Sequence, residues 1–244
     1  MLSNCLLRDA SMYRSYNLLQ PGYITTNLFL NLDAYSYSGT GNTWYDLSGN
    51  NRNAVIVNNP TYTTNQNGYF HFTDTSFQYA ITTNTVPSLS TWSLEAWYRP
   101  TKSFTGKVTS VVSNEFDLVN KINYSLGTNN APSSYTLAGG YYNGAWRTTA
   151  GFVPTLNTWV QTFVTYNGTN INQYTNGSLQ STLAYSGTPQ SGGKIRIARR
   201  WDEVDTSSSN FFDGDISIIR IYSVALNVSQ VVQNYNAIKE RYGL

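Results

Sequence analysis

NFFDGDISIIRIYSVALNVSQVVQNYNAIKERYGL, residues 210–244, is the stretch that decides the fold. Its first half holds a dense apolar run formed by Ile216, Ile218, Ile219 and Ile221. A strand with one face in water alternates apolar and polar residues, whereas this run is apolar on both faces. It therefore predicts a central strand inside a β-sandwich.

The second half of this stretch predicts a short helix that closes the domain. Apolar residues recur at i, i+4, i+7 and i+11, which is the stripe of one helix face; they are Val231, Tyr235, Ile238 and Tyr242. Asn227, with Gln230 three residues later, fits a capping box at the start of the helix, and Gly243 supplies a stop at its end.

The closing strand also follows a family pattern, F-x-G-x-I-x-x-x-R-I-Y-x-x-A-L. The positions that match it are Phe212, Gly214, Ile216, Arg220, Ile221, Tyr222, Ala225 and Leu226. At these residues the chain resembles the laminin G-like, concanavalin A-like jelly-roll domains. The match is specific for the fold, but one fold hosts many activities, so the function has to be argued from the site.

Two further stretches carry the same resemblance. Residues 28–62 are similar to the opening strand and loop of laminin G-like modules of phages and bacteria, through Leu32, Asp33, Ala34, Trp44, Asp46, Leu47, Ser48, Gly49, Asn50, Pro60 and Tyr62. Residues 159–177 follow W-x-x-x-x-V-T-Y-x-G and then Y-x-N-G, through Trp159, Val164, Thr165, Tyr166, Gly168, Tyr174, Asn176 and Gly177. In this second stretch, Asn167-Gly168 and Asn176-Gly177 predict two hairpin turns.

The resemblance implies an all-β fold, a two-sheet antiparallel jelly-roll sandwich that covers residues 28–244 and ends in the short helix. The segment TWSLEAWYRP, residues 91–100, agrees with this, because its side chains alternate between two faces as in a strand. Residues 1–27 differ in character and form an N-terminal arm. The arm either packs on the domain or anchors it to another subunit, and the sequence leaves both readings open.

Composition excludes several classes of function. The chain has 15 Lys and Arg against 13 Asp and Glu, and it holds no basic run that would neutralise a phosphate backbone, so we expect no nucleic-acid partner. Cys5 is the only cysteine and His71 the only histidine, which argues against a disulfide framework and a zinc site. The sequence predicts no secretion signal and no membrane span. His71 is expected to be structural.

Paired carboxylates are the first test for catalysis, since glucanases share this fold. Glu115 and Asp117 project from one face of a predicted strand and resemble the start of a retaining glucanase motif. The third acid is missing, because Val119 and Asn120 stand where a second Glu would be, and a retaining mechanism needs two carboxyl groups about 5 Å apart. Asp213 and Asp215 are also two residues apart, but Asp213-Gly214 fits turn chemistry equally well. We therefore expect no enzyme.

Loop acids suggest a calcium site, since hard cations prefer carboxylate and carbonyl oxygens. The resemblance adds that many laminin G-like domains bind this ion at a rim of the sandwich. The candidate ligands are Asp74, Asp202, Glu203, Asp205 and Asp213. None of them matches a loop of fixed ligand spacing, and solvated loop acids remain the alternative interpretation.

Aromatic residues near amides or charged groups suggest a sugar surface, because rings cover the apolar faces of sugars while polar groups bond the hydroxyls. One such cluster lies on a predicted hairpin and consists of Tyr141, Tyr142, Asn143 and Trp146. A second begins a long loop and consists of Arg199, Arg200, Trp201 and Asp202. The alternative is that half of these aromatics pack in the core.

Three functions follow from these expectations. The favoured one, by resemblance to phage proteins, is a non-enzymatic virion structural or surface protein, such as a capsid decoration or fibre component, whose lectin-like domain meets host or environmental glycans. Residues 1–27 would then dock on other virion proteins, with several copies in the assembly. The alternatives are a stand-alone carbohydrate-binding module, in an extracellular or cell-surface setting, and a glycoside hydrolase or lyase of the same fold.

Overall fold

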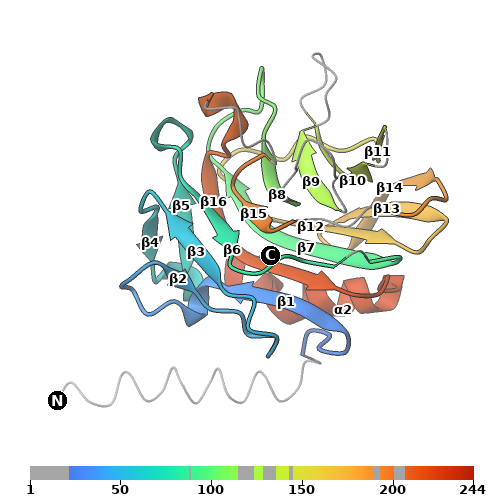
Figure 1. Cartoon of the computed structure of the whole chain (residues 1–244), viewed down its shortest axis with the longest axis horizontal. Helices are drawn as coiled ribbons and strands as arrows, with labels where there is room; N and C mark the ends of the chain where they lie inside the picture. The colour runs from blue at the N-terminus through green and yellow to red at the C-terminus, as the bar shows by residue number, and fades with distance from the viewer. Residues whose placement is uncertain are drawn as a thin grey trace.

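The computed structural model describes residues 22–87, 89–114, 124–128, 136–142, 145–189, 193–200 and 207–244. Two eight-stranded sheets pack face to face, and all strand pairs within them are antiparallel. A short helix lies at the C-terminal end (Figure 1). The predicted jelly-roll sandwich is therefore confirmed. None of the helices in these ranges is long and apolar enough to cross a membrane.

The first sheet, sheet A, has the order β14-β13-β12-β7-β16-β5-β4, and β1 also pairs with β16. In chain order its strands are β1 (Leu28–Asp33), β4 (Thr61–Thr63), β5 (Tyr69–Phe72), β7 (Trp92–Pro100), β12 (Val160–Tyr166), β13 (Asn170–Thr175), β14 (Ser178–Ala184) and β16 (Gly214–Tyr222).

The second sheet, sheet B, has the order β11-β10-β9-β8-β15-β6-β3-β2. Its strands are β2 (Thr43–Trp44), β3 (Ala54–Val57), β6 (Tyr79–Thr82), β8 (Ser110–Asn114), β9 (Ser125–Thr128), β10 (Leu137–Tyr142), β11 (Trp146–Thr148) and β15 (Ile195–Ile197). The helix is α2 (Val228–Ile238), and the 3-10 turns are η1 (Ala34–Ser36), η2 (Asn65–Asn67), η3 (Asp74–Ser76), η4 (Ser208–Asn210) and η5 (Lys239–Tyr242).

Strand β16 is the centre of sheet A, as its apolar run predicts. All nine of its residues are buried. It pairs with β7 along one edge and with β5 and β1 along the other. A strand enclosed on both faces and both edges cannot tolerate polar groups without partners, which explains its isoleucine content.

Helix α2 covers the outer face of sheet A, and its predicted cap is confirmed. Asn227 and Gln230 form the reciprocal capping box, and the chain leaves η5 at Gly243 in a left-handed conformation, φ 72°. The ring of Trp97 on β7 stacks on the rings of Tyr235, at 5.9 Å, and Tyr242, at 4.8 Å, between centroids. These contacts pack the stripe seen in the sequence against sheet A, although its last member, Tyr242, lies in η5 rather than in the helix.

The two predicted hairpins are also confirmed. Asn167-Gly168 joins β12 to β13, and Asn176-Gly177 joins β13 to β14. At the second turn both residues have positive φ, 49° and 75°. This is the backbone of a type I′ turn, which follows the twist of the flanking strands.

Residues 22–27, assigned above to the arm, contact the domain. The backbone N–H of Ile24 donates to Asn234 Oδ1 at 2.8 Å, and Tyr222 Oη donates to the Ile24 carbonyl at 3.0 Å. Ile24 also packs against the apolar cluster beneath α2. The earlier part of the arm lies outside the described residues.

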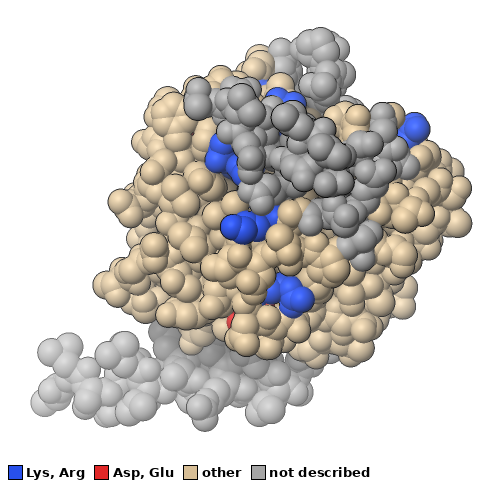
Figure 2. All heavy atoms as spheres, viewed as in Figure 1, with Lys and Arg blue, Asp and Glu red and all other residues tan. Residues whose placement is uncertain are grey.

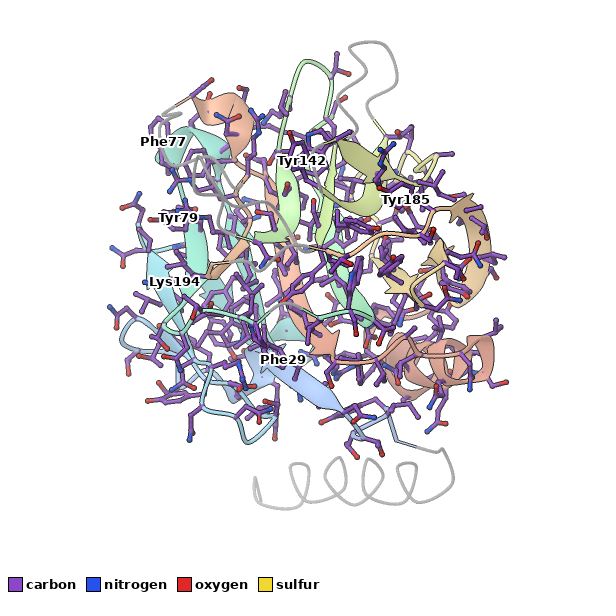
Figure 3. The ribbon with its side chains drawn as sticks, turned by 45° about the vertical axis from the view of Figure 1, so that its right-hand side comes forward. Phe29, Phe77, Tyr79, Tyr142, Tyr185 and Lys194 are labelled. Carbon is purple, nitrogen blue, oxygen red and sulfur yellow. The ribbon has the colours of Figure 1, made fainter. Side chains whose placement is uncertain are left out.

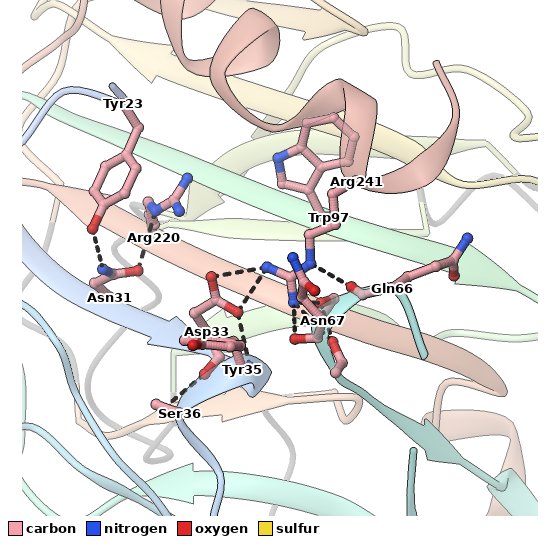
Figure 4. Close-up of polar contacts among 12 residues, drawn as sticks. Tyr23, Asn31, Asp33, Tyr35, Ser36, Gln66, Asn67, Trp97, Arg220 and Arg241 are labelled. Carbon is pink, nitrogen blue, oxygen red and sulfur yellow. Dashed lines mark hydrogen bonds and ion pairs between the residues drawn. The ribbon is translucent and has the colours of Figure 1, made fainter. Parts of the chain in front are cut away.

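A buried ion pair lies between sheet A and α2. The Arg220 guanidinium donates to Glu95 Oε2 at 3.3 Å and to Asn31 Oδ1 at 3.1 Å (Figure 4 shows the Asn31 contact). Glu95 also accepts from Trp97 Nε1 at 2.9 Å and Asn234 Nδ2 at 2.9 Å. Both charged side chains are fully enclosed, so each depends on the other and on the surrounding donors.

A second arginine fastens the C-terminal turn to the start of the domain. Arg241 Nη1 donates to both carboxylate oxygens of Asp33 at 2.9 Å, and Nη2 reaches the carbonyls of Asn67 and Gly68 at 2.7 and 2.9 Å (Figure 4). Gly68 has φ 97°, and a Cβ there would meet Tyr62 and the Ala34 carbonyl at 2.8 to 2.9 Å. Only glycine suits this turn.

The single histidine is paired with a carboxylate of the chain. His71 Nδ1 lies 2.9 Å from Asp215 Oδ1, and Arg99 Nε donates to the other carboxylate oxygen of Asp215 at 2.6 Å. The hydrogen bond to Asp215 raises the pKa of His71, and this effect exceeds the opposing effect of burial. Folding therefore favours the protonated imidazole.

We predict that Arg220→Met strongly destabilises the protein. The substitution keeps an apolar stem but leaves Glu95 buried without its cation, and breaking such a pair costs about 3 to 5 kcal/mol. Urea unfolding followed by fluorescence measures the change. The double variant Glu95→Gln with Arg220→Met should recover part of the loss. A single variant as stable as the wild type would show that the pair contributes nothing.

We also predict that His71 makes stability depend on pH. Because its folded pKa is raised from 6.5, its contribution is fully present below the unfolded pKa and is lost as pH rises through the folded value. The free energy of unfolding should therefore fall, relative to His71→Gln, as pH rises above about 6.5. Identical pH profiles for the two proteins would contradict the pairing with Asp215.

Candidate functional site

The outer face of sheet B carries an aromatic pair at the β10–β11 hairpin. Tyr142 on β10 is in register with Trp146 on β11, and the two rings meet edge to face with centroids 5.4 Å apart. Both side chains are half-buried. Side chains alternate along a strand, so Tyr142 points to the face opposite that of Tyr141.

Tyr141 does not lie on this surface, contrary to its place in the predicted ligand cluster. Its side chain is fully buried and packs on Tyr166 of β12, in sheet A, with ring centroids 4.9 Å apart. Gly139, two residues before Tyr141, faces the same way, since a Cβ there would collide with Val164 of β12. Odd-numbered residues of β10 therefore face the core, and even-numbered residues face outward.

Beside the aromatic pair, a row of small residues that ends in Arg196 and Ile81 crosses the outer face of sheet B. Strand register aligns one row, which runs Thr148, Gly140, Ser125, Ser113, Arg196 and Ile81. From β10 to β15 the row crosses three strand spacings, about 14 Å. Its central members, Gly140, Ser125, Ser113 and Arg196, are buried, so the accessible parts of this face are its two ends.

The second end of the face is built around Arg199. Its guanidinium carbon lies 4.8 Å from the ring centroid of Tyr79 and 5.2 Å from that of Phe211. Phe77, 40% exposed, packs edge to face on Phe211. Strands β10 and β6 are separated by β9, β8 and β15 in sheet B, and Figure 3 shows Phe77 and Tyr79 to the left of Tyr142 and Tyr185. The two aromatic groups are therefore separate surfaces.

The sequence did not single out several residues near these two ends. Tyr185, which follows β14, stacks under Arg147 with 4.4 Å between the guanidinium carbon and the ring centroid. Tyr79 and Phe77 join Arg199 from distant parts of the chain. None belongs to a local motif, and only strand pairing brings them to these positions.

Positive charge is visible on this face. Figure 2, drawn from the same side as Figure 1, shows several Lys and Arg side chains among the coloured atoms and very little acidic surface. The cations associated with β15 and the segment after it are Lys194, Arg196, Arg199 and Arg200, and each of them already has interaction partners. Their charges are therefore engaged within the protein.

Two of the predicted acidic ligands, Asp74 and Asp213, lie close together. Lys102 Nζ contacts an oxygen of each, at 3.0 and 2.8 Å. Asp215, two residues further on, is held instead by Arg99 and His71. Within the part of the chain that the structure describes, no three His, Cys, Asp or Glu side chains gather as a metal site.

Several predicted residues cannot be placed. The glucanase-like pair Glu115 and Asp117 lies outside the described residues, as do Asn143, Trp201, Asp202, Glu203 and Asp205. Of the predicted sugar-binding residues, the structure places Tyr142 and Trp146 together on one face and Arg199 at its far end. Asp213 and Asp215 are the predicted carboxylate pair that the structure describes, and they are bound to Lys102 and Arg99 of the chain itself.

Comparison with solved structures supports the architecture. Domain 4 of a GH43 extracellular arabinanase from Geobacillus stearothermophilus, in complex with arabinotriose, superposes with a TM-score of 0.66 at 17% identity, over 86% of this chain and 98% of that one. The binding domain of Paraclostridial Mosquitocidal Protein 1 gives a TM-score of 0.66 at 15% identity, over 87% of this chain and 52% of that one.

A botulinum toxin domain shows the same likeness. The receptor binding domain of botulinum neurotoxin D gives a TM-score of 0.63 at 14% identity, over 87% of this chain and 53% of that one. The chain thus spans about half the length of the toxin domains it matches. At these identities the likeness establishes the fold alone.

Sequence comparison identifies the family directly. No curated protein matches the chain, but the family described as the concanavalin A-like lectin/glucanases superfamily matches residues 73–232. That match covers most of the chain and includes β7, β12, β13 and β16, the strands that form the centre of sheet A. The chain therefore belongs to the concanavalin A-like lectin/glucanase superfamily.

Proposed function

We propose that the protein is a non-enzymatic glycan-binding domain whose sugar contact is the aromatic pair Tyr142 and Trp146. The observation that carries the proposal is the placement of both rings on the outer face of sheet B, at the end of a row of small residues. Rings of this kind cover the apolar face of a sugar, and neighbouring polar groups orient its hydroxyls. Thr148, on the same face of β11 as Trp146, offers such a hydroxyl.

The ligand we propose is a neutral oligosaccharide, because Arg147 stacks on Tyr185 and the cations around β15 already have interaction partners. Residues 148–193 contain no charged side chain. They include β12, β13 and β14 of sheet A, and Tyr141 of the hairpin packs on Tyr166 of β12. The arabinanase domain of the same fold was solved with arabinotriose, a neutral oligosaccharide. A site of aromatic, hydroxyl and glycine groups suits a ligand that offers hydroxyls and C–H faces more than one that offers charge.

For the biological setting we propose a virion surface, with the domain as part of a phage capsid decoration or fibre. Support comes from the opening stretch, residues 28–62, which resembles laminin G-like modules of phages and bacteria. Residues 1–27 would attach the domain to other virion proteins, with several copies in the assembly. A stand-alone carbohydrate-binding module, extracellular or at a cell surface, is the alternative, and glycan binding at Tyr142 and Trp146 is common to both settings.

A hydrolase or lyase of this fold remains the contrasting function. It would depend on Glu115 and Asp117, and the sequence provides no third acid beside them. Incubation with polysaccharides followed by chromatography of the products distinguishes the classes. Release of oligosaccharides that Glu115→Gln abolishes would replace the binding proposal with an enzymatic one.

We predict that Trp146→Ala and Tyr142→Ala each weaken glycan binding at least about tenfold, which corresponds to about 1.4 kcal/mol. The reason is loss of the ring surface that covers the sugar. A glycan array identifies the ligand, and calorimetry with the best hit measures the affinity. Tyr35→Ala is the matched control, because that ring is 70% exposed and follows β1 of sheet A. Unchanged affinity in both test variants would exclude this surface.

We also predict that deletion of residues 1–21 leaves a folded domain that no longer joins its assembly. The cut is placed there because Tyr23 and Ile24 contact the domain, so a longer deletion would also remove packing. Circular dichroism checks the fold, and copurification with particles checks assembly. Incorporation equal to that of the full chain would contradict the anchoring role.

A further inference from the structure

Three segments distant in sequence meet around one ammonium group at a rim of the sandwich. Lys102, in the connection after β7, contacts Asp74 Oδ1 at 3.0 Å and Asp213 Oδ2 at 2.8 Å. Asp74 begins η3, between β5 and β6, and Asp213 precedes β16. The two carboxylate side chains are 7% and 5% exposed. Two such acids repel each other unless a cation lies between them.

The other carboxylate oxygens are also occupied by donors of the chain. Lys107 forms an ion pair with Asp74 Oδ2, and Thr101 Oγ1 donates to Asp213 Oδ1 at 2.6 Å. The backbone N–H of Thr75 donates to Asp74 Oδ1 at 2.7 Å. All four carboxylate oxygens therefore accept hydrogen bonds from the protein.

This arrangement does not fit the calcium ion that the sequence suggested for Asp74 and Asp213. Calcium takes about 6 to 8 oxygen ligands at 2.3 to 2.6 Å, whereas the groups that face these carboxylates are two ammonium groups, a hydroxyl and two backbone N–H groups. Two carboxylates and two ammonium groups balance in charge. A divalent ion placed among them would meet both ammonium groups at close range.

The protonation states agree with this charge balance. Burial acts to raise the pKa of Asp74, but the hydrogen bonds from Lys107 and Lys102 outweigh it and lower the pKa to about 2. The hydrogen bonds with Asp213 and Asp74 raise the pKa of Lys102. Both partners therefore stay charged from mildly acidic to mildly alkaline pH.

We propose that Lys102 takes the place of a divalent cation between Asp74 and Asp213, so that this rim is held together without metal. The ammonium group joins η3, the β7–β8 connection and the start of β16, as a bound ion would. Removal of the ammonium group leaves two buried carboxylates with fewer donors between them. That vacated pair is then a cation site in the variant.

The experiment compares thermal unfolding of the wild type, Lys102→Met and Lys102→Arg, each in EDTA and in millimolar calcium chloride. In EDTA, Lys102→Met should unfold at a temperature lower by several degrees, since about 1 kcal/mol shifts Tm by about 2 to 4 °C in a domain of this size. Calcium should restore part of that loss in Lys102→Met. The wild type and Lys102→Arg keep the positive charge and should respond to calcium less than Lys102→Met.

Two controls keep the result specific. Lys239→Met removes an ammonium group that lies over the Tyr235 ring, and it should not gain a calcium response. Asp213→Asn added to Lys102→Met should abolish the gained response. If Lys102→Met responds to calcium no more than the wild type, the proposal is overturned. If Lys102→Met does not fold, isothermal titration of the wild type decides: calcium binding that Asp213→Asn abolishes overturns the proposal, and any other result supports it.

Discussion

The buried carboxylate of Glu95 is the constraint on which sheet A depends. It accepts hydrogen bonds from Trp97 on its own strand, Gln161 on β12, Arg220 on β16 and Asn234 on α2. One side chain thus links three adjacent strands and the helix above them. A buried charge without these partners would cost several kcal/mol, so a shift of register by one residue would separate donors from acceptor and is strongly disfavoured.

This constraint also determines which face of the sandwich is left for function. The polar network and the rings of Trp97, Tyr235 and Tyr242 fill the space between sheet A and the C-terminal helix. The inner faces of both sheets form the core. No helix of the described chain covers the outer face of sheet B (Figure 1). Because the middle of that face is buried, its two ends are the surfaces left for function.

Local signals in the sequence account for what could be predicted. The apolar run of β16, the capping box of α2 and the two Asn-Gly turns each lie within a few residues, and all are confirmed. The burial of Tyr141 could not be read from the sequence, because the Gly139-Gly140 pair gives no apolar alternation that shows which residues of β10 face inward. The direction of Tyr141 depends on Val164, which is distant in sequence.

The acidic side chains explain why the candidate site was harder to predict than the fold. Asp33 is bound to Arg241, Glu95 to Arg220, Asp215 to Arg99, and Asp74 and Asp213 to Lys102. In the sequence Asp74, Asp213 and Asp215 look like candidates for catalysis or metal binding, because their partners lie 28 to 144 residues away. Once each is paired with a cation of the chain, it contributes to the scaffold. The ligand surface proposed above, at Tyr142 and Trp146, uses neutral aromatic and hydroxyl groups instead, and such groups suit holding a ligand rather than acid-base chemistry on it.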